Sequence, residues 1–199
     1  MNQNGQGIKL DTNRLVLREL RKEDEASIVK NANNLNVTQY MTILPYPYTL
    51  MDAEWFVNKT LEQSAKNIDE RTDFGFAITF RDSDILMGVI GLSKVDRFEG
   101  TGIVGYWLGE MFWKKGIMSE AARTVIDFAF NKINLRRINI SAVPENTTSN
   151  ALIRSLGFSY EGTRRKKHRS KSTGKIHDLN EYGLLAEEWA KSRNENKMH

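Results

Sequence analysis

The chain has 199 residues, and its hydrophobic content of 40% is enough to fill the core of one domain of ordinary size. Twenty-nine Lys and Arg residues against 25 Asp and Glu give a net charge of +4, a mild excess that favours anionic ligands without requiring nucleic acid. The chain contains no cysteine, which excludes disulfides, thiolate metal sites and a thiol nucleophile and is compatible with a reducing cytoplasm.

Helix and strand signals alternate along the first part of the chain. The sequence predicts a strand at 14–20, a helix at 22–34, an extended loop at 41–50 and a second helix at 51–68. Leu15 and Leu17 alternate with charged neighbours, as in a half-buried strand. Pro45 and Pro47 prevent the helical segments from joining.

The rest of the chain predicts a sheet with at least one parallel connection. The first three strands follow one another directly and indicate an antiparallel meander. The later strand, helix, strand order requires a parallel crossover. No repeat or linker interrupts the chain, so we expect one mixed α/β domain over residues 1–199. Strands are expected at 74–80, 85–95, 101–110 and 136–143, helices at 119–130 and 147–157, and a terminal hairpin at 158–170 and 175–189.

The histidines and the first residues of the chain bear on metal binding and on membrane targeting. His168, His177 and His199 include no pair at the i, i+4 spacing of a helical zinc site, so we expect no metal. The first residues, MNQNGQGIKLD, lack a basic segment followed by an apolar core. No apolar run approaches the roughly 18 residues that span a bilayer. We therefore expect a soluble, cytoplasmic protein with no membrane contact.

The segment WKKGIMSEAARTVIDFAF places Lys114, Lys115 and Gly116 just ahead of an amphipathic helix. The first N–H groups of a helix lack partners inside it and carry the positive end of its dipole. A glycine lets a phosphate approach these amides, and the lysines add positive charge. The pattern predicts a diphosphate site. A solvated turn remains the alternative, because one glycine is a weak signal and neither nucleotide-binding glycine motif is present.

The segment YWLGEMFWKKGIMSEAARTVIDFAF resembles GNAT-superfamily N-acetyltransferases, in particular the branch that acetylates the N-termini of ribosomal proteins. The resemblance extends from TNRLVLREL, through GVIGL and ENTTSNALIRSLGFSYEGT, to HDLNEYGLLAEEW. It implies an α/β (α+β) fold with a mixed, mainly antiparallel sheet of about seven strands, flanked by helices. The sheet would be splayed between its fourth and fifth strands, with acetyl-CoA lying in the opening.

The resemblance also implies two stretches that contact acetyl-CoA. The backbone of Trp107, Leu108 and Gly109 would pair with the pantetheine arm. The chain departs from the family pattern at Trp113, where glutamine or arginine is usual, and at Met118, where a small residue is usual. The diphosphate would be cradled by the loop and first helical turn, namely Lys114, Lys115, Gly116, Ile117, Met118 and Ser119.

The segment ENTTSNALIRSLGF supports two interpretations. Asn146 and Ser149 stand where a helix begins, and both residue types are preferred helix caps. The resemblance implies instead that Asn146 contacts coenzyme A and that the Ser149 hydroxyl, the candidate catalytic group, lies beside the thioester sulfur. Asn150 and Arg154 would lie near the cofactor. A thiol has a pKa of about 8.5, so Ser149 need only donate a hydrogen bond to the leaving thiolate.

The acceptor amine must be unprotonated to attack. An α-amino group has a pKa of about 7.7–8.0 against about 10.4 for lysine, so an N-terminal acceptor tolerates a weak base. The resemblance places an acidic residue where this chain has Ile103. Glu99, Glu110 and Asp178 are the remaining candidates, each also compatible with ordinary surface charge. Without cysteine, we expect direct transfer within a ternary complex.

These observations give one leading hypothesis and two alternatives. The leading hypothesis is an acetyl-CoA-dependent N-acetyltransferase acting on a protein N-terminal α-amine. The first alternative acceptor is a small amine such as an aminoglycoside or polyamine. The second alternative is a non-catalytic module that binds RNA or a partner through RRKKHRSK (164–171). That run lacks aromatic residues for base stacking, so it predicts a solvated hairpin with a weak electrostatic contact to ribosome or RNA. A homodimer is compatible with the sequence.

Overall fold

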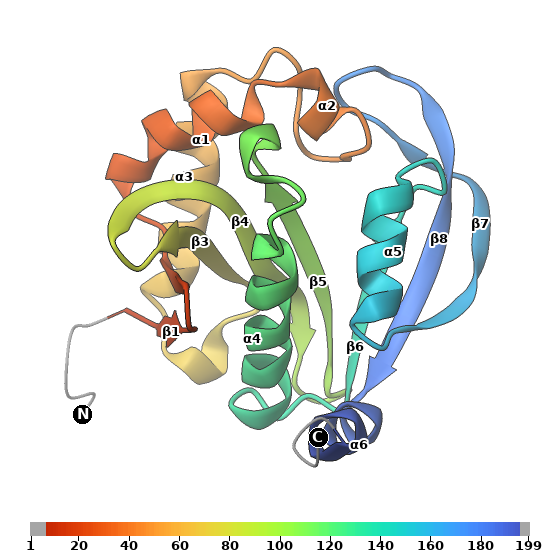
Figure 1. The fold of residues 1–199 in the computed structure, drawn as a ribbon. Coiled ribbons are helices and arrows are strands. Elements are labelled where there is room, and N and C mark those ends of the chain that lie inside the picture. Colours follow the sequence, from red (N-terminus) through yellow and green to blue (C-terminus); the bar gives the residue numbers. More distant parts are fainter. Residues whose placement is uncertain (1–6, 196–199) are drawn as a thin grey trace.

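The computed structural model describes residues 7–195, and an eight-stranded sheet forms its centre (Figure 1). The strand order is β1-β2-β3-β4-β5-β6-β8-β7. All neighbouring strands are antiparallel except β5 and β6, which are parallel. The predicted mixed sheet and its parallel crossover are confirmed. The strands are β1 (Lys9–Asp11), β2 (Leu15–Glu19), β3 (Phe74–Phe80), β4 (Ser83–Asp96), β5 (Thr101–Leu108), β6 (Arg137–Ala142), β7 (Ser159–Arg169) and β8 (Ile176–Leu185). His199 lies outside the described residues.

Helices cover both faces of the sheet. α1 and α3 pack on one face, against β4 and β3, while α4 and α5 lie on the other, against β2, β4 and β6 (Figure 1). The helices are α1 (Glu25–Ala32), α2 (Leu35–Thr38), α3 (Leu50–Ser64), α4 (Ile117–Asn131), α5 (Thr147–Ser155) and α6 (Ala186–Glu195). Short 3₁₀ turns occur at η1 (Lys22–Asp24), η2 (Ile68–Glu70) and η3 (Glu110–Phe112).

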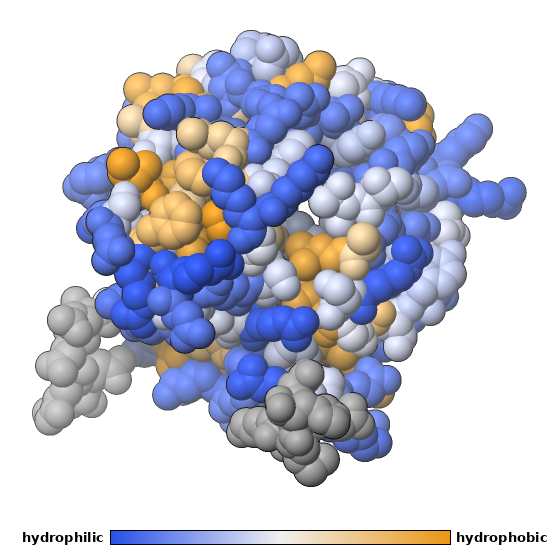
Figure 2. Space-filling view, viewed as in Figure 1, coloured by the Kyte–Doolittle hydropathy of each residue, from blue (hydrophilic) through white to orange (hydrophobic). Residues whose placement is uncertain are grey.

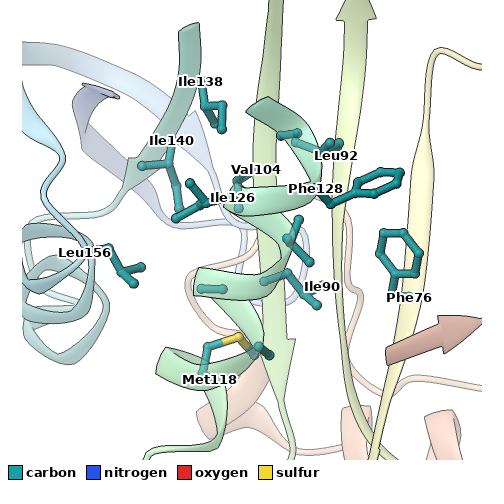
Figure 3. Close-up of a cluster of buried hydrophobic side chains, with 14 of the residues drawn as sticks. Phe76, Ile90, Leu92, Val104, Met118, Ile126, Phe128, Ile138, Ile140 and Leu156 are labelled. Atoms are coloured by element: carbon teal, nitrogen blue, oxygen red, sulfur yellow. The ribbon is translucent and has the colours of Figure 1, made fainter. Parts of the chain in front are cut away.

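Each face of the sheet has its own hydrophobic core. On the α4 side, Val125 and Phe128 belong to the larger cluster, and the Phe128 ring meets the edge of Phe76 with the ring centroids 5.6 Å apart (Figure 3). On the other face, α1 and α3 cover Trp107 of β5. Leu108, the next residue along β5, is buried in the larger cluster instead. Because successive side chains of a strand point to opposite faces, β5 is fixed from both sides.

β5 and β6 are paired only where they begin. Residues 101–103 of β5 pair with residues 137–139 of β6. β5 then continues to Leu108 and β6 to Ala142, and the two strands separate toward these ends (Figure 1). The expected splay is therefore present. It lies between β5 and β6, because β1 adds one strand at the edge that the sequence did not predict.

The chain ends differ from the sequence prediction. β1 has three residues and α2 has four, too few to give a periodic signal. The expected strand at 175–189 ends at Leu185, where α6 begins. The N–H of Leu185 donates to Glu188 Oε2 at 2.9 Å, and the indole N–H of Trp189 donates to Asp127 Oδ1 of α4 at 2.7 Å. These side-chain partners favour a helix over continued sheet pairing.

Candidate functional site

The opening between β5 and β6 forms a cleft of about 400 Å³. The face in Figure 2, seen from the same side as Figure 1, shows hydrophobic residues in separate groups among hydrophilic ones. The cleft, rather than an apolar patch on this face, is therefore the candidate site. Its walls are formed by Asn36, Val37, Gln39, Tyr40 and Met41 around α2, by Tyr106, Trp107 and Leu108 of β5, by residues 112–119, and by residues 145–149 with Leu152.

One end of the cleft is the start of α4. Gly116 is the N-cap residue and has a φ of 71°, in the left-handed region that favours glycine. Lys114 also has a positive φ, of 58°. A side chain added at Gly116 would meet only Arg14 Nη2, at 3.4 Å, so the space before the helix is open. The Met118 side chain is 8% exposed and packs in the core rather than over the first turn (Figure 3).

Arg14, just before β2, holds this loop in place. Its Nη1 donates to the carbonyl oxygen of Lys115 at 3.1 Å, and its Nε donates to Glu120 Oε2 at 2.7 Å. The Thr12 hydroxyl donates to Glu120 Oε1 at 2.6 Å. Burial disfavours the charged form of Glu120, but the hydrogen bonds from Thr12 and Arg14 outweigh it and lower the pKa of this carboxyl. Arg14 therefore offsets the negative charge in the first turn of α4.

Trp113 joins the same loop to β5. Its indole N–H donates to the carbonyl oxygen of Leu108 at 2.7 Å. On the other side of β5, Trp107 and Leu108 are in register with Val89 and Gly88 of β4. The departure from the family pattern at Trp113 thus has a structural reason, because a tryptophan N–H can reach back to the end of the strand. The Leu108 carbonyl, one of the groups expected to face pantetheine, is already engaged.

A hydrogen bond crosses the opening from β5 to α5. The Tyr106 hydroxyl and Ser149 Oγ are 2.9 Å apart, and both residues line the cleft. The backbone N–H of Ser149 donates to Asn146 Oδ1 at 3.2 Å, so the helix-cap interpretation of Asn146 is confirmed. Burial raises the pKa of Tyr106, although the Ser149 hydrogen bond opposes this shift. The Tyr106 hydroxyl is therefore protonated at neutral pH, and either hydroxyl of the pair can be the donor.

Comparison with known proteins identifies the family. The acetyltransferase (GNAT) domain matches residues 14–159. The chain belongs to the GNAT acetyltransferase family. The crystal structure of a GNAT-family acetyltransferase from Bacillus anthracis has a TM-score of 0.76 and 25% identity and covers 90% of this chain and 99% of that one. The fold and the open sheet are thus those of an acetyltransferase.

Three relatives show the range of the family around this acetyltransferase. The uncharacterized N-acetyltransferase p20 of Bacillus licheniformis is 33% identical over 181 residues, 91% of this chain and 98% of the relative. The ribosomal-protein-serine acetyltransferase of Escherichia coli is 34% identical over 79 residues, 40% of this chain and 44% of the relative. The spermidine N(1)-acetyltransferase of Escherichia coli is 25% identical over 146 residues, 73% of each chain.

Three expected cofactor residues of this acetyltransferase lie outside the cleft lining. A side chain at Gly109 would collide with Asn31 Oδ1, so this glycine serves close packing. Asn150 is buried, and its Oδ1 accepts hydrogen bonds from Asn180 and from the Tyr182 hydroxyl at 3.0 and 2.6 Å. Its Nδ2 donates to the carbonyl oxygens of Val143 and Asn146, so Asn150 ties α5 to β8. The Arg154 guanidinium lies over the Tyr182 ring, 5.9 Å from its centroid.

The three candidate bases named from the sequence also lie outside the cleft lining. Glu99 is in the turn before β5 and contacts Arg136 at 3.3 Å. Glu110 accepts a hydrogen bond from the side-chain amide of Asn36 at 2.9 Å. Asp178 accepts a backbone N–H from β7 at 2.8 Å. Each of these carboxylates has a structural partner, in agreement with the surface-charge interpretation.

One carboxylate does line the cleft, and no sequence motif points to it. Glu145 precedes the cap of α5, and it is the single acidic residue among the lining residues of the described chain. The hydrogen bond from its own backbone N–H is the largest cause of its lowered pKa, and His177 and Lys175 add to the effect against the cost of burial. Ile103, at the position where the resemblance implies an acid, lies in the paired start of β5.

The basic run forms the outer strand of the predicted hairpin, β7 paired with β8. The register shifts between Arg164 and His168, so the intervening basic residues bulge from the sheet edge and are exposed. Arg164 Nε lies 2.8 Å from Glu181 Oε2. At the tip of the hairpin, the N–H of Lys171 donates to the carbonyl oxygen of Met41 at 3.2 Å. The tip therefore meets the α2 side of the cleft.

Within residues 7–195, no group of three or more histidine or carboxylate side chains is placed to hold a metal ion. None of the helices in the same residues is both long enough and apolar enough to cross a membrane.

Proposed function

We propose that the chain transfers an acetyl group from acetyl-CoA to the α-amine of a protein N-terminus. The observation that carries this proposal is the cleft in the splayed sheet, with the open start of α4 at one end and the Tyr106–Ser149 hydrogen bond between its walls. Family membership supports the reaction class.

We propose that the diphosphate of acetyl-CoA binds the first backbone amides of α4, at residues 116–119. Gly116 leaves this end open, and Lys114 and Lys115 add charge. The pantetheine arm would follow β5 along Trp107, and Asn146 would contact it from α5. Asn150 would support this contact from behind, since its Nδ2 donates to the Asn146 carbonyl oxygen at 2.7 Å. Arg154 would act only at a distance, through its charge.

The Tyr106–Ser149 pair is suited to receive the leaving thiolate. When the amine attacks, the new C–N bond forms, the C–S bond breaks, and negative charge moves to sulfur. If the Tyr106 hydroxyl donates to Ser149 Oγ, the single Ser149 proton is free to point at that sulfur. A hydrogen bond from a preorganised donor stabilises developing charge without reorganisation. Ser149 is therefore the proposed catalytic group, and Tyr106 orients its hydroxyl.

The charge of the cleft favours an α-amine over a polyamine as acceptor. Glu145 is the one carboxylate among the lining residues of the described chain, against Lys114 and Lys115. A polyamine carries several positive charges and would require several acidic partners. The similarity to a spermidine acetyltransferase keeps a small amine as the second candidate. The similarity to a ribosomal-protein-serine acetyltransferase supports the first.

The test combines binding and turnover. Calorimetric titration with acetyl-CoA should show one site. Thiol release should then be measured against N-terminal peptides, lysine peptides and polyamines, with mass spectrometry to locate the acetyl group. Acetylation at the peptide α-amine is the expected result. Binding of acetyl-CoA with polyamines as the preferred acceptors would reassign the acceptor. No binding at millimolar acetyl-CoA would refute the enzyme and favour a partner-binding module.

We further propose that residues 1–199 form one domain that acts in the cytoplasm. The eight strands belong to one sheet, which supports a single folding unit. The lack of cysteine fits a reducing compartment.

A further inference from the structure

Two buried histidines on the terminal hairpin have unpaired nitrogens. His168 on β7 is 5% exposed, His177 on β8 is 4% exposed, and their ring centroids are 6.0 Å apart. His168 Nε2 and both ring nitrogens of His177 are buried without a hydrogen-bond partner. Buried polar atoms in folded proteins are almost always paired, so such exceptions call for a functional explanation. The His177 ring is the more exceptional of the two.

His177 lies directly behind the wall of the cleft. Its Nδ1 is 3.4 Å from Glu145 Oε2, and the Tyr40 ring meets its ring edge-on with the centroids 5.8 Å apart. Glu145 and Tyr40 both line the cleft. The side chain of Glu145 is 50% exposed, so one carboxylate group reaches both the cleft and the buried imidazole.

Glu145 lies at the same end of α5 as Ser149, the proposed catalytic group. It immediately precedes Asn146, whose side chain caps the turn that carries Ser149. Ser149 and Glu145 therefore line the same cleft from the same end of α5. The charged and titratable groups that face Glu145 are His177 from β8 and Lys175 from the hairpin turn. His168 faces His177 from β7, and Tyr40 faces it from the α2 side.

We propose that Glu145 is the group that accepts the proton lost by the acceptor amine, and that His177 is a positioning residue that holds the Glu145 carboxylate toward the cleft. This proposal rests on the proposed function. Glu145 would supply a base that Ile103 cannot provide and that the three acids outside the cleft are not placed to provide. An acidic side chain behind the α5 cap takes the place of an acidic side chain on β5.

The proton balance follows from the acetyl transfer. The neutral amine forms a bond to the acetyl carbon, and its nitrogen becomes positively charged and hence acidic. The nitrogen gives one proton to the Glu145 carboxylate while the C–S bond breaks. Ser149 donates a hydrogen bond to the leaving thiolate, which then takes one proton from solvent. Glu145 then returns its proton to water through its exposed half. The products are the N-acetyl amide and free coenzyme A, with no net change in the enzyme.

The central variant is Glu145→Gln, which keeps the shape of the side chain and removes its basicity. We expect kcat for the peptide acceptor to fall by about 10²-fold, the lower end of the contribution of a general base, with acetyl-CoA affinity within about twofold of wild type. Glu99→Gln is the matched control, since it makes the same change outside the cleft. A Glu145→Ala variant should recover activity when formate is added as a replacement carboxylate.

His177 requires a comparison of two variants. His177→Asn keeps an N–H that can face Glu145, whereas His177→Phe does not. We expect the phenylalanine variant to lose kcat and the asparagine variant to recover most of it, at equal KM for acetyl-CoA. Equal loss in both variants would mean that His177 only fills space, which would overturn its positioning role.

The outcomes separate this proposal from the function on which it rests. A wild-type chain that acetylates no acceptor in the panel removes the proposed function. Wild-type activity together with an equally active Glu145→Gln variant removes only the role of Glu145. A rise in the acceptor KM at unchanged kcat would also overturn it, because Glu145 would then bind the ammonium group and not take its proton. A Glu145→Ala variant whose kcat does not rise when formate is added would likewise overturn the role of Glu145.

Discussion

Replacing Gly116 with alanine tests whether the diphosphate of acetyl-CoA binds at the start of α4. The variant should lose both thermal stability and affinity for acetyl-CoA. Gly116 has a φ of 71°, and an L-residue in this left-handed region costs about 1–2 kcal/mol. For a chain of this length, this free energy corresponds to a fall in Tm of about 2–8 °C. The new methyl group would also project into the space before α4, where only Arg14 Nη2 lies within 3.4 Å. Loss of one hydrogen bond to a charged phosphate costs about 1.5–3 kcal/mol, or roughly 10- to 150-fold in the Kd for acetyl-CoA.

Gly174 provides the matched control for this change. It has a φ of 69° at the tip of the terminal hairpin, and an added side chain would meet nothing within 4 Å. Gly174→Ala should therefore lower the Tm, measured by differential scanning fluorimetry, by about as much as Gly116→Ala. Only Gly116→Ala should weaken acetyl-CoA binding by calorimetry. Equal acetyl-CoA affinity in the two variants would refute the assignment of the diphosphate to the start of α4.

Three further predictions concern the cleft and the buried hairpin. Trp113→Phe removes the indole donor to Leu108 and should raise the KM for acetyl-CoA about fivefold at constant kcat, whereas an unchanged KM would show that the loop does not need this bond. Tyr106→Phe leaves Ser149 without its hydrogen-bond partner and should lower kcat about tenfold in thiol-release assays, with little change in the Kd for acetyl-CoA. An unaltered kcat would contradict the role of Tyr106 in orienting the Ser149 hydroxyl. Burial, helped by the charge of His177, lowers the pKa of His168, so the unfolded chain binds more protons and stability should fall as the pH drops below about 6.5. Urea unfolding should then show a smaller difference between pH 5.5 and pH 7.5 for His168→Gln than for wild type, and an equal difference would oppose this assignment.

Much of the fold could be predicted because most elements have a strong local period. α4 is an example, since Val125 and Phe128 repeat with the helical period and are buried as expected. The segment GLLAEEW is a counter-example, because its apolar residues suit a strand or a helix equally well. The helix is decided by Trp189, whose partner Asp127 is 62 residues away. No local pattern contains that contact.

The sequence indicates the part of the cleft that one continuous segment forms, and it does not indicate the parts where distant side chains meet. The loop around Gly116 lies in the cleft as expected, because its glycine and lysines are consecutive. Tyr106 was overlooked although it begins the quoted YWL motif, because Ser149 is 43 residues away. Glu145 was overlooked because its neighbour His177 comes from another strand. Contacts of this kind depend on tertiary structure alone.

The backbone bond between Lys171 and Met41 has a consequence for how this protein can diverge. It joins two surface segments from opposite halves of the chain, and neither segment belongs to the start of α4 or to β5. Surface loops tolerate insertions and deletions far better than the elements they connect. A change in length at either segment would widen or narrow the α2 side of the cleft while leaving the start of α4 and β5 unchanged. Related chains could therefore change which acceptors the cleft admits by changing only the segments around Met41 and Lys171.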